Sequence, residues 1–573
     1  MVQSHKLIEE KEDMKLLKTT DKNHKSNVIK TYISEFEQYV IFAYLFCMLG
    51  VFPLHYKEQY YKIGDVKFEF FWNSSLVFIG IFIVLTLIKN VNRIKRQEEV
   101  NPLFQFLNTL SSLDYAVFIY GLCVVLSYAF SDFKDFAFKG AAGWEMGLCS
   151  QMIFIVVYFI LSRQRKVILV IPVIHLISSA LTFLFGILHR FEIDPLGMYV
   201  GLDLYQKIEF LSTIGQATWF SSYVCTVFAV GVTLFYVSEQ KWLRVVTGIY
   251  SVISFGILVT QNSDSAFIAI AGILLLLGYF SLSDMKKWCR FWQIMSLMWG
   301  TFAGIGILPR IFANKAIPLD SLSVFFSQSV VTWMMLFISL IVMLFFSNYN
   351  KKKVIGNQFK NSNNKGKYFD NEDKIMSITK AVYKGIVLSL AAAVVLIIMF
   401  IYLNTKGYLL QWFGYQSTHQ YLLFDYHWGS NRGSTWMICW QSFAEMPFYQ
   451  KLFGVGPDSV SAYLYSIPDI SDLLHSLWGN LRLTNAHNEY LNSLLCYGIV
   501  GLAAWLAVLV GGICYFYHKA KENPLMIAFA LCIMGYACHN IFCYQQVCAT
   551  PLLFIALGIG ESLTKSENFN TIK

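Results

Sequence analysis

The sequence predicts an all-α polytopic membrane protein, with about 14 transmembrane helices and one large extracytoplasmic loop that contains short amphipathic helices. Of its 573 residues, 56% are hydrophobic and only 14% are charged, against roughly 25% charged residues in soluble proteins. Apolar runs of about 16 to 23 residues fill most of the chain, and this length matches the hydrocarbon core of a bilayer. These observations exclude a soluble globular protein.

The predicted spans are the apolar runs that charged residues bound. In order they cover residues 39–54, 70–88, 113–130, 143–161, 167–187, 218–237, 243–260, 265–281, 290–308, 326–346, 381–403, 495–516, 526–543 and 548–562. Residues 1–38 are polar and lysine-rich, which predicts a cytoplasmic N-terminal tail and no cleavable signal peptide. Residues 563–573 form a C-terminal tail.

The distribution of Lys and Arg predicts the orientation of these spans. With the N-terminus in the cytoplasm and the sides alternating, most cationic residues fall in cytoplasmic segments, including 163–166, 286–287 and 351–380. This is the pattern of the positive-inside rule, so we expect both termini in the cytoplasm of a plasma-membrane protein. These loops also account for the net charge of +9, and we expect no nucleic-acid partner.

The chain is predicted to divide at its longest outer loop. Residues 39–403 hold the first eleven spans and a flexible polar cytoplasmic linker at 347–380. Residues 404–489 form the extracytoplasmic loop, which is far longer than an ordinary connection and is therefore expected to be functional. Residues 490–562 hold the last three spans.

The twelve cysteines do not predict a disulfide framework, because many lie inside apolar runs where they pack as small hydrophobes. There is no CxxC pair, no HExxH sequence and no acidic calcium loop, and the histidines are scattered. We therefore expect a metal-independent mechanism and no cofactor.

Two apolar stripes in the outer loop predict short surface helices. Ser471 and Asp472 are suited to cap one helix. Its apolar face would comprise Leu474, Leu477, Trp478 and Leu481. Trp436, Trp440 and Phe443 form a second stripe. We expect both helices to lie along the membrane or to pack on the spans.

The glycines at 454 and 456, followed by Pro457 and Asp458, form a tight-turn signature. A short glycine-rich stretch also presents backbone N–H groups to phosphate, which is the alternative reading.

His487 lies just before the apolar run 494–517. With Thr484 or Asn485 as N-cap, it would occupy the first turn of a helix that enters the membrane from outside. The helix dipole there disfavours the imidazolium, so a neutral imidazole could accept a proton, and the exposed N–H groups would attract an anion such as pyrophosphate. The alternative is an interfacial histidine without a role.

Arg432 is one of four cationic residues in the outer loop, with Lys406, Lys451 and Arg482. A guanidinium binds phosphate oxygens in a bidentate manner. The alternative is an ordinary solvated arginine. Together, Arg432 and a base at His487 indicate group transfer from a phosphorylated lipid at the outer leaflet.

Several segments resemble those of one family in their order along the chain. They are Gly215 to Tyr223, Gln261 to Ala266, Arg432 with Trp436, Leu452 to Gly456, Ala486 to Leu491, and Gly498 with Gly501. From about residue 205 to 562 the chain resembles the O-antigen ligase and O-antigen polymerase superfamily of bacterial membrane glycosyltransferases.

The resemblance implies a glycan donor linked to undecaprenyl diphosphate, which is transferred at the outer face of the plasma membrane without a metal ion or a nucleotide sugar. It implies that His487 is the general base, that Arg432 binds the diphosphate, and that the anomeric configuration inverts. Further candidates for substrate binding are Asp264, Gln216, Lys207, Arg482, Asn488 and Tyr490.

Two positions depart from the family pattern. Asp264, beside Ser263, stands where the family often has arginine, and the arginine expected before Gly215 is absent. Compensation could come from a cation elsewhere, with Lys207, Arg190 and Arg482 as candidates. Asp264 could instead hold an acceptor hydroxyl or face an aqueous cavity.

The functional alternatives remain open at the level of sequence. The span count favours a polysaccharide polymerase over a ligase that moves finished glycan to lipid or protein, because ligases have roughly twelve spans. A flippase or transporter of lipid-linked sugars and an inactive scaffold are the other readings. Expected partners are the lipid bilayer, the lipid-linked oligosaccharide donor, a glycan or lipid acceptor, and polysaccharide assembly proteins.

Overall fold

The computed structural model describes residues 31–95, 107–143, 145–164, 170–313, 315–358, 365–419 and 421–565. Almost all regular structure in these ranges is helical, which confirms the predicted fold class. The one sheet in the described ranges is a two-stranded antiparallel hairpin, in which Phe210 pairs with Gln216 and Leu211 with Gly215.

Ten helices in the described part of the chain are long and apolar enough to cross a membrane. The first covers Thr31–Leu54 and ends in η1 (Phe46–Val51) and η2 (Phe52–Leu54). The others are α2 (Ile63–Lys95), α4 (Ser112–Phe130), α7 (Val170–His189), α9 (Ala217–Val227) continued by α10 (Ala229–Val237), α11 (Lys241–Thr260), α13 (Met285–Ile311), α15 (Val330–Gln358), α16 (Lys365–Thr405) and α22 (Glu489–Glu522).

Four shorter apolar helices complete the set. They are α6 (Leu148–Leu161), α12 (Ser265–Ser281), η4 (Pro524–Met526) joined to α23 (Ile527–His539), and α24 (Thr550–Thr564). Each of the fourteen predicted apolar runs coincides with one of these long or short helices.

Contacts between the ends of these helices join segments that the predicted topology assigns to one side. At one end, Asp114 at the start of α4 is buried and pairs with Arg163 after α6 and Lys565 after α24, each at 3.1 Å. At the other end, Trp219 Nε1 donates to the hydroxyl of Tyr544 at 3.0 Å. This pattern agrees with a path that alternates between the two faces of the bundle.

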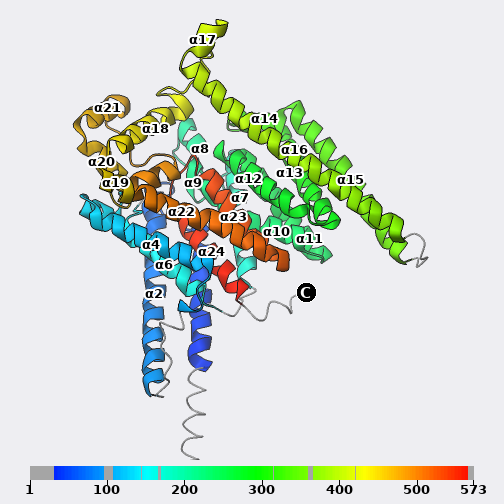
Figure 1. The fold of residues 1–573 in the computed structure, drawn as a ribbon, viewed down its shortest axis with the longest axis horizontal. Helices are drawn as coiled ribbons and strands as arrows, with labels where there is room; N and C mark the ends of the chain where they lie inside the picture. Colours follow the sequence, from blue (N-terminus) through cyan, green and yellow to red (C-terminus); the bar gives the residue numbers. More distant parts are fainter. Residues whose placement is uncertain are drawn as a thin grey trace, which may run out of the picture.

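The region predicted as a flexible linker, 347–380, is largely helical. Helix α15 continues to Gln358, and α16 begins at Lys365. Helix α16 lies at the periphery of the bundle (Figure 1), and no residue in its most apolar stretch is buried inside the protein. That exposed surface is suited to contact lipid.

The outer loop folds into short helices, and the first of them stands apart from the others at the tip of α16 (Figure 1). They are α17 (Tyr408–Phe413), α18 (Trp428–Glu445), α19 (Phe448–Phe453), α20 (Val460–Ser466) and α21 (Pro468–Trp478). The remaining elements are α5 (Lys134–Lys139), α8 (Leu204–Glu209), β1 (Phe210–Leu211), β2 (Gly215–Gln216) and α14 (Ser321–Gln328).

The predicted cap of α21 is wrong, because the helix starts earlier, with Pro468 in its first turn. Pro at this position lacks only an N–H that the helix would leave unpaired. Leu474 is fully buried as predicted, but Leu481 lies beyond the end of the helix and is 72% exposed.

The Gly454 turn packs against a break in α22. Gly498 has a φ of +68° and interrupts the helix, which frees the carbonyls of Leu495 and Cys496. Val455 and Gly456 donate their N–H groups to these two carbonyls at 3.0 and 3.1 Å. The segment is therefore a turn, and these N–H groups are already used by the protein rather than free for phosphate.

Candidate functional site

His487 does not lie in a helical turn, so the predicted capping by Thr484 or Asn485 is wrong. Asn488 is the N-cap of α22, and its side chain accepts from Leu491 N at 2.9 Å. His487 precedes it with a φ of +48°, and its N–H donates to Asn485 Oδ1 at 3.0 Å. The backbone thus turns sharply just before the helix, and His487 lies outside the helix.

The loop that carries His487 is tied to two helices. Trp436 Nε1 on α18 donates to Ala486 O at 3.1 Å, and Asn492 Oδ1 on α22 accepts from Ala486 N at 3.1 Å. The Tyr544 ring meets the imidazole edge-on, with 5.5 Å between centroids. Two of these contacts hold the backbone of the loop at Ala486, and Tyr544 contacts the imidazole itself.

The imidazole itself makes no hydrogen bond within the described part of the chain, although its backbone N–H does. Burial, and secondly the charge of Arg432, lower the pKa of His487 to about 4. The ring is therefore neutral at physiological pH, with a nitrogen able to accept a proton.

Arg432 follows a left-handed run in α18 that covers Gly429, Ser430 and Asn431. This kink turns the backbone so that Arg432 Nη1 donates to Gly429 O at 2.9 Å, while the guanidinium lies 5.9 Å from the ring centroid of Phe542. Its Nε is buried and has no hydrogen-bond partner among the described residues. Burial lowers the pKa of Arg432 from its ordinary value, but the group stays charged.

Asp264 lies near this guanidinium, between α11 and α12. The Tyr421 hydroxyl donates to its Oδ2 at 3.2 Å, whereas its Oδ1 is buried without a hydrogen-bond partner in the described ranges. Burial, and secondly Asp320, raise the pKa of Asp264, while Tyr421 and Arg432 act in the opposite direction. His487, Arg432 and Asp264 therefore each bring to one region a polar side-chain atom that no described residue pairs.

An aromatic wall borders the site. Trp436 stacks on Phe542 with 5.7 Å between centroids, and Trp428 lies 5.2 Å from Trp436. Phe542 and Tyr544 belong to the connection between α23 and α24, and neither was predicted to be a site residue. The polar run from Tyr544 to Gln546 between two apolar helices was the available signal.

Four other predicted substrate-binding residues have structural partners. Gln216 caps α9 by accepting from Thr218 N, Lys207 pairs with Glu192 at 2.8 Å, Asn488 caps α22, and the Tyr490 hydroxyl donates to Ala537 O. The partners in these contacts are residues other than His487, Arg432 and Asp264.

The cations that could replace the missing arginines are also engaged. Arg190 is 1% exposed and donates to the carbonyls of Thr260, Lys207 and Ile208. Arg482 donates to Ser461 Oγ at 2.9 Å and lies over the Tyr465 ring. Arg190 thus holds three backbone carbonyls together. Arg482 packs against residues of α20.

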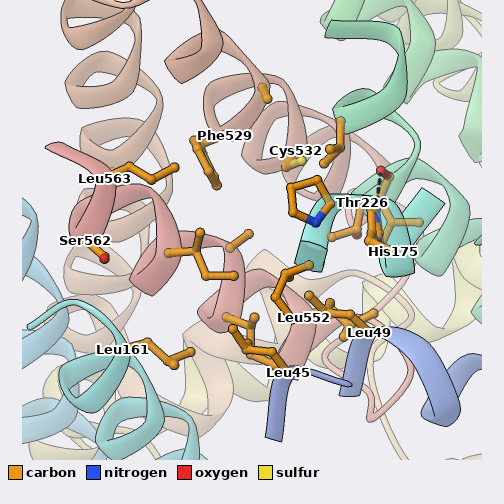
Figure 2. Close-up of a pocket in the computed structure, with 18 of the residues that line it drawn as sticks. Leu45, Leu49, Leu161, His175, Thr226, Phe529, Cys532, Leu552, Ser562 and Leu563 are labelled. Carbon is orange, nitrogen blue, oxygen red and sulfur yellow. Dashed lines mark hydrogen bonds between the residues drawn. The ribbon is translucent and has the colours of Figure 1, made fainter. Parts of the chain in front are cut away.

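An apolar cavity lies elsewhere in the bundle. Figure 2 shows Leu45, Leu49 and Leu552 on its walls, with Ser562 on one side and His175 and Thr226 on the other. Its lining is almost entirely carbon and includes none of the candidate site residues. The cavity therefore offers apolar contact, and none of its lining residues is Lys, Arg, Asp or Glu.

No group of three or more His, Cys, Asp or Glu residues in the described ranges is arranged to hold a metal ion.

The fold and this cluster define a polytopic helical membrane protein with its polar site at one end of the bundle. Residues 316–506 match the O-antigen ligase family. The match extends from the connection before α14 into α22, so it includes Arg432, the Gly454 turn and His487, and it confirms the predicted resemblance to the O-antigen ligase and polymerase superfamily. A comparison with curated proteins gave no match.

Proposed function

We propose that this protein is a glycosyltransferase that uses a glycan linked to undecaprenyl diphosphate at the outer face of the plasma membrane. One observation carries the proposal: the neutral imidazole of His487, which makes no hydrogen bond to a described residue, lies in the electrostatic field of Arg432, whose Nε has no partner in the same ranges. A base beside an anion-binding cation is what transfer of a sugar from a diphosphate requires.

In the proposed reaction, the acceptor hydroxyl oxygen attacks the anomeric carbon of the donor sugar. The bond from that carbon to the diphosphate oxygen breaks, and its electron pair leaves with the undecaprenyl diphosphate. The proton of the hydroxyl passes to a ring nitrogen of His487 and then to water. Attack opposite the leaving group inverts the anomeric configuration.

Arg432 would bind the diphosphate through its guanidinium and stabilise the negative charge that develops on it. Its stacking on Phe542 limits the motion of the side chain. The diphosphate would also offset the positive charge of Arg432 and thereby raise the pKa of His487 when the donor binds. His487 would then become a stronger base only in the loaded enzyme.

Asp264 and Tyr421 are suited to hold the acceptor hydroxyl, because the Asp264 carboxylate has one buried oxygen without a partner in the described ranges. The same oxygens would repel diphosphate. We therefore assign Asp264 to binding of the acceptor and Arg432 to binding of the donor. The proposal also places both termini in the cytoplasm and the outer loop on the extracytoplasmic side.

Polymerisation of lipid-linked repeat units is the favoured activity, because the ten long and four shorter apolar helices of the described ranges, counted together, exceed the roughly twelve spans of ligases. The test compares surface glycans on gels from the source strain with the wild-type protein, His487→Ala or His518→Ala. His518 is an exposed histidine at the other end of α22, so it serves as the matched control.

At matched expression, we expect His487→Ala to reduce the long ladder to single repeat units, a loss of about 10²–10⁴-fold in rate, and His518→Ala to keep the ladder. Intact polymer that fails to reach its acceptor would identify a ligase instead. An unchanged ladder in His487→Ala would contradict the catalytic assignment and favour a transporter or a scaffold.

A further inference from the structure

Glu489, two residues after His487, is a buried carboxylate that the proposed reaction does not use. Its side chain is 1% exposed at the start of α22. The Tyr536 hydroxyl and Gln545 Nε2 both donate to Oε1 at 3.2 Å, and Asn540 Nδ2 donates to Oε2. All three donors are neutral. A buried acid that the described residues hold without a cation is costly, which indicates a role beyond packing.

The neighbouring residues of α23 extend this network. Asn540 uses its amide N–H for Glu489, so its Oδ1 is oriented to accept from His539 Nδ1 at 3.2 Å. His539 Nε2 is then the acceptor for the hydroxyls of Ser221 and Ser265, each at 2.9 Å. The carboxylate therefore sets the amide orientation of Asn540, and Asn540 sets the imidazole tautomer of His539.

This network joins the segments that carry the candidate site. Ser265 directly follows Asp264, and Glu489 lies on the helix that begins after the His487 loop. Glu489 N also donates to Asn540 O at 3.0 Å. Asn540 starts the connection that brings Phe542 under Arg432 and Tyr544 against His487.

We propose that Glu489, acting through Asn540 and His539, is the positioning residue that fixes His487 relative to Asp264 and Arg432. This inference rests on the proposed glycosyl transfer. Glu489 touches none of the reacting groups, so its contribution is to geometry. Misplacement of reacting groups by about 1 Å can cost on the order of 10²-fold in rate.

An exchange of the two partners tests the contact directly. In Glu489→Gln, the new amide N–H would face Asn540 Nδ2, so two donors oppose each other. In Asn540→Asp, two carboxylates oppose each other. In the double variant Glu489→Gln with Asn540→Asp, the amide donates to the carboxylate, and the bonds from Tyr536, Gln545 and His539 keep their acceptors.

The measurement uses full-length protein in liposomes and lipid-linked oligosaccharide extracted from the His487→Ala strain. We expect each single variant to lose about 10- to 100-fold in kcat with KM within about twofold, and the double variant to recover most of kcat. Tyr236→Phe is the control for a lost buried hydrogen bond, because it removes the contact with Ser281 on α12. It should lower the unfolding temperature without lowering kcat.

Wild-type kcat in both single variants would overturn the inference, as would a loss confined to KM or a double variant as slow as the singles. If the single variants do not fold, Ser265→Ala tests the far end of the network, since His539 keeps Ser221 as a donor. A wild-type kcat in that variant would also overturn it. Activity in His487→Ala would instead refute the proposed function itself, whatever the Glu489 variants do.

Discussion

The guanidinium of Arg432 lowers the pKa of His487, although Arg432 lies on α18 and His487 lies 55 positions later, in the loop before α22. Burial lowers this pKa in the same direction and by more. The two effects leave a neutral imidazole in the unloaded protein. Removal of either effect would change the pH at which the base becomes protonated.

Arg432→Gln should therefore change the pH profile as well as the rate. The base form of His487 is lost as pH falls through about 4, so kcat/KM of the wild-type protein should fall only near that pH. Without the guanidinium the pKa rises, and the acid limb should move to higher pH while remaining below the ordinary 6.5, because burial persists. The rate at neutral pH should fall about 10²–10³-fold.

Arg310→Gln is the control, since Arg310 is an exposed residue at the end of α13. It should leave the pH profile unchanged. An acid limb at the same pH in Arg432→Gln and wild type would show that Arg432 does not act on the base.

A second comparison uses the wild-type protein alone. If bound diphosphate offsets the charge of the Arg432 guanidinium, the acid limb of kcat should lie at higher pH than the acid limb of kcat/KM.

The close packing of the Gly454 turn against Gly498 predicts that a larger residue at position 498 destabilises the protein. Gly498 has a φ of +68°, and an added Cβ would overlap the backbone of Leu452. Gly498→Ala should destabilise the protein by more than the roughly 1–3 kcal/mol of backbone strain alone, because the turn must also move. The measurement is the unfolding temperature in detergent.

Gly511→Ala is a matched control on the same helix, because a Cβ there meets no atom within 4 Å. It should be neutral or slightly stabilising, since alanine favours helix by about 1 kcal/mol over glycine. Equal unfolding temperatures for the two variants would mean that the break in α22 is not enforced by this contact.

The helices were predictable because hydropathy measures directly what a bilayer requires of a span. The start of α22 was not, because several residues suited to capping lie close together, and the contact of Trp436 with the Ala486 carbonyl acts between distant segments. Local propensity does not encode that contact. Arg432 and His487 were recognised by residue type and family resemblance, whereas their shared environment depends on how α18 packs.

The predicted substrate-binding residues show what the sequence alone could not predict. Gln216 and Asn488 were predicted to bind substrate, but the side chains of both cap helices. Glu489 was not predicted to have a role, and its hydrogen-bond partners come from α23 and the connection that follows it. A sequence pattern cannot distinguish a structural role from a ligand-binding role when the residues that contact the side chain are distant in the sequence.

Asp458 supplies a third prediction, on the pH dependence of stability. Its carboxylate is buried in the Gly454 turn, and Oδ2 accepts from Ala141 N at 2.8 Å and Met146 N at 3.1 Å. Burial first, and the charge of Glu145 in addition, raise the pKa of Asp458 to about 7, although both N–H groups act to lower it. The folded protein thus binds this proton more tightly than the unfolded chain.

A raised carboxyl pKa favours folding most at pH below the unfolded value of about 4, and this contribution is lost as pH rises through about 7. Asp458→Asn keeps an oxygen for both N–H groups, tolerates the φ of +53°, and does not titrate. Its unfolding temperature relative to wild type should therefore rise between pH 5 and pH 8. A difference that stays constant over this range would mean that Asp458 does not titrate there in the folded protein.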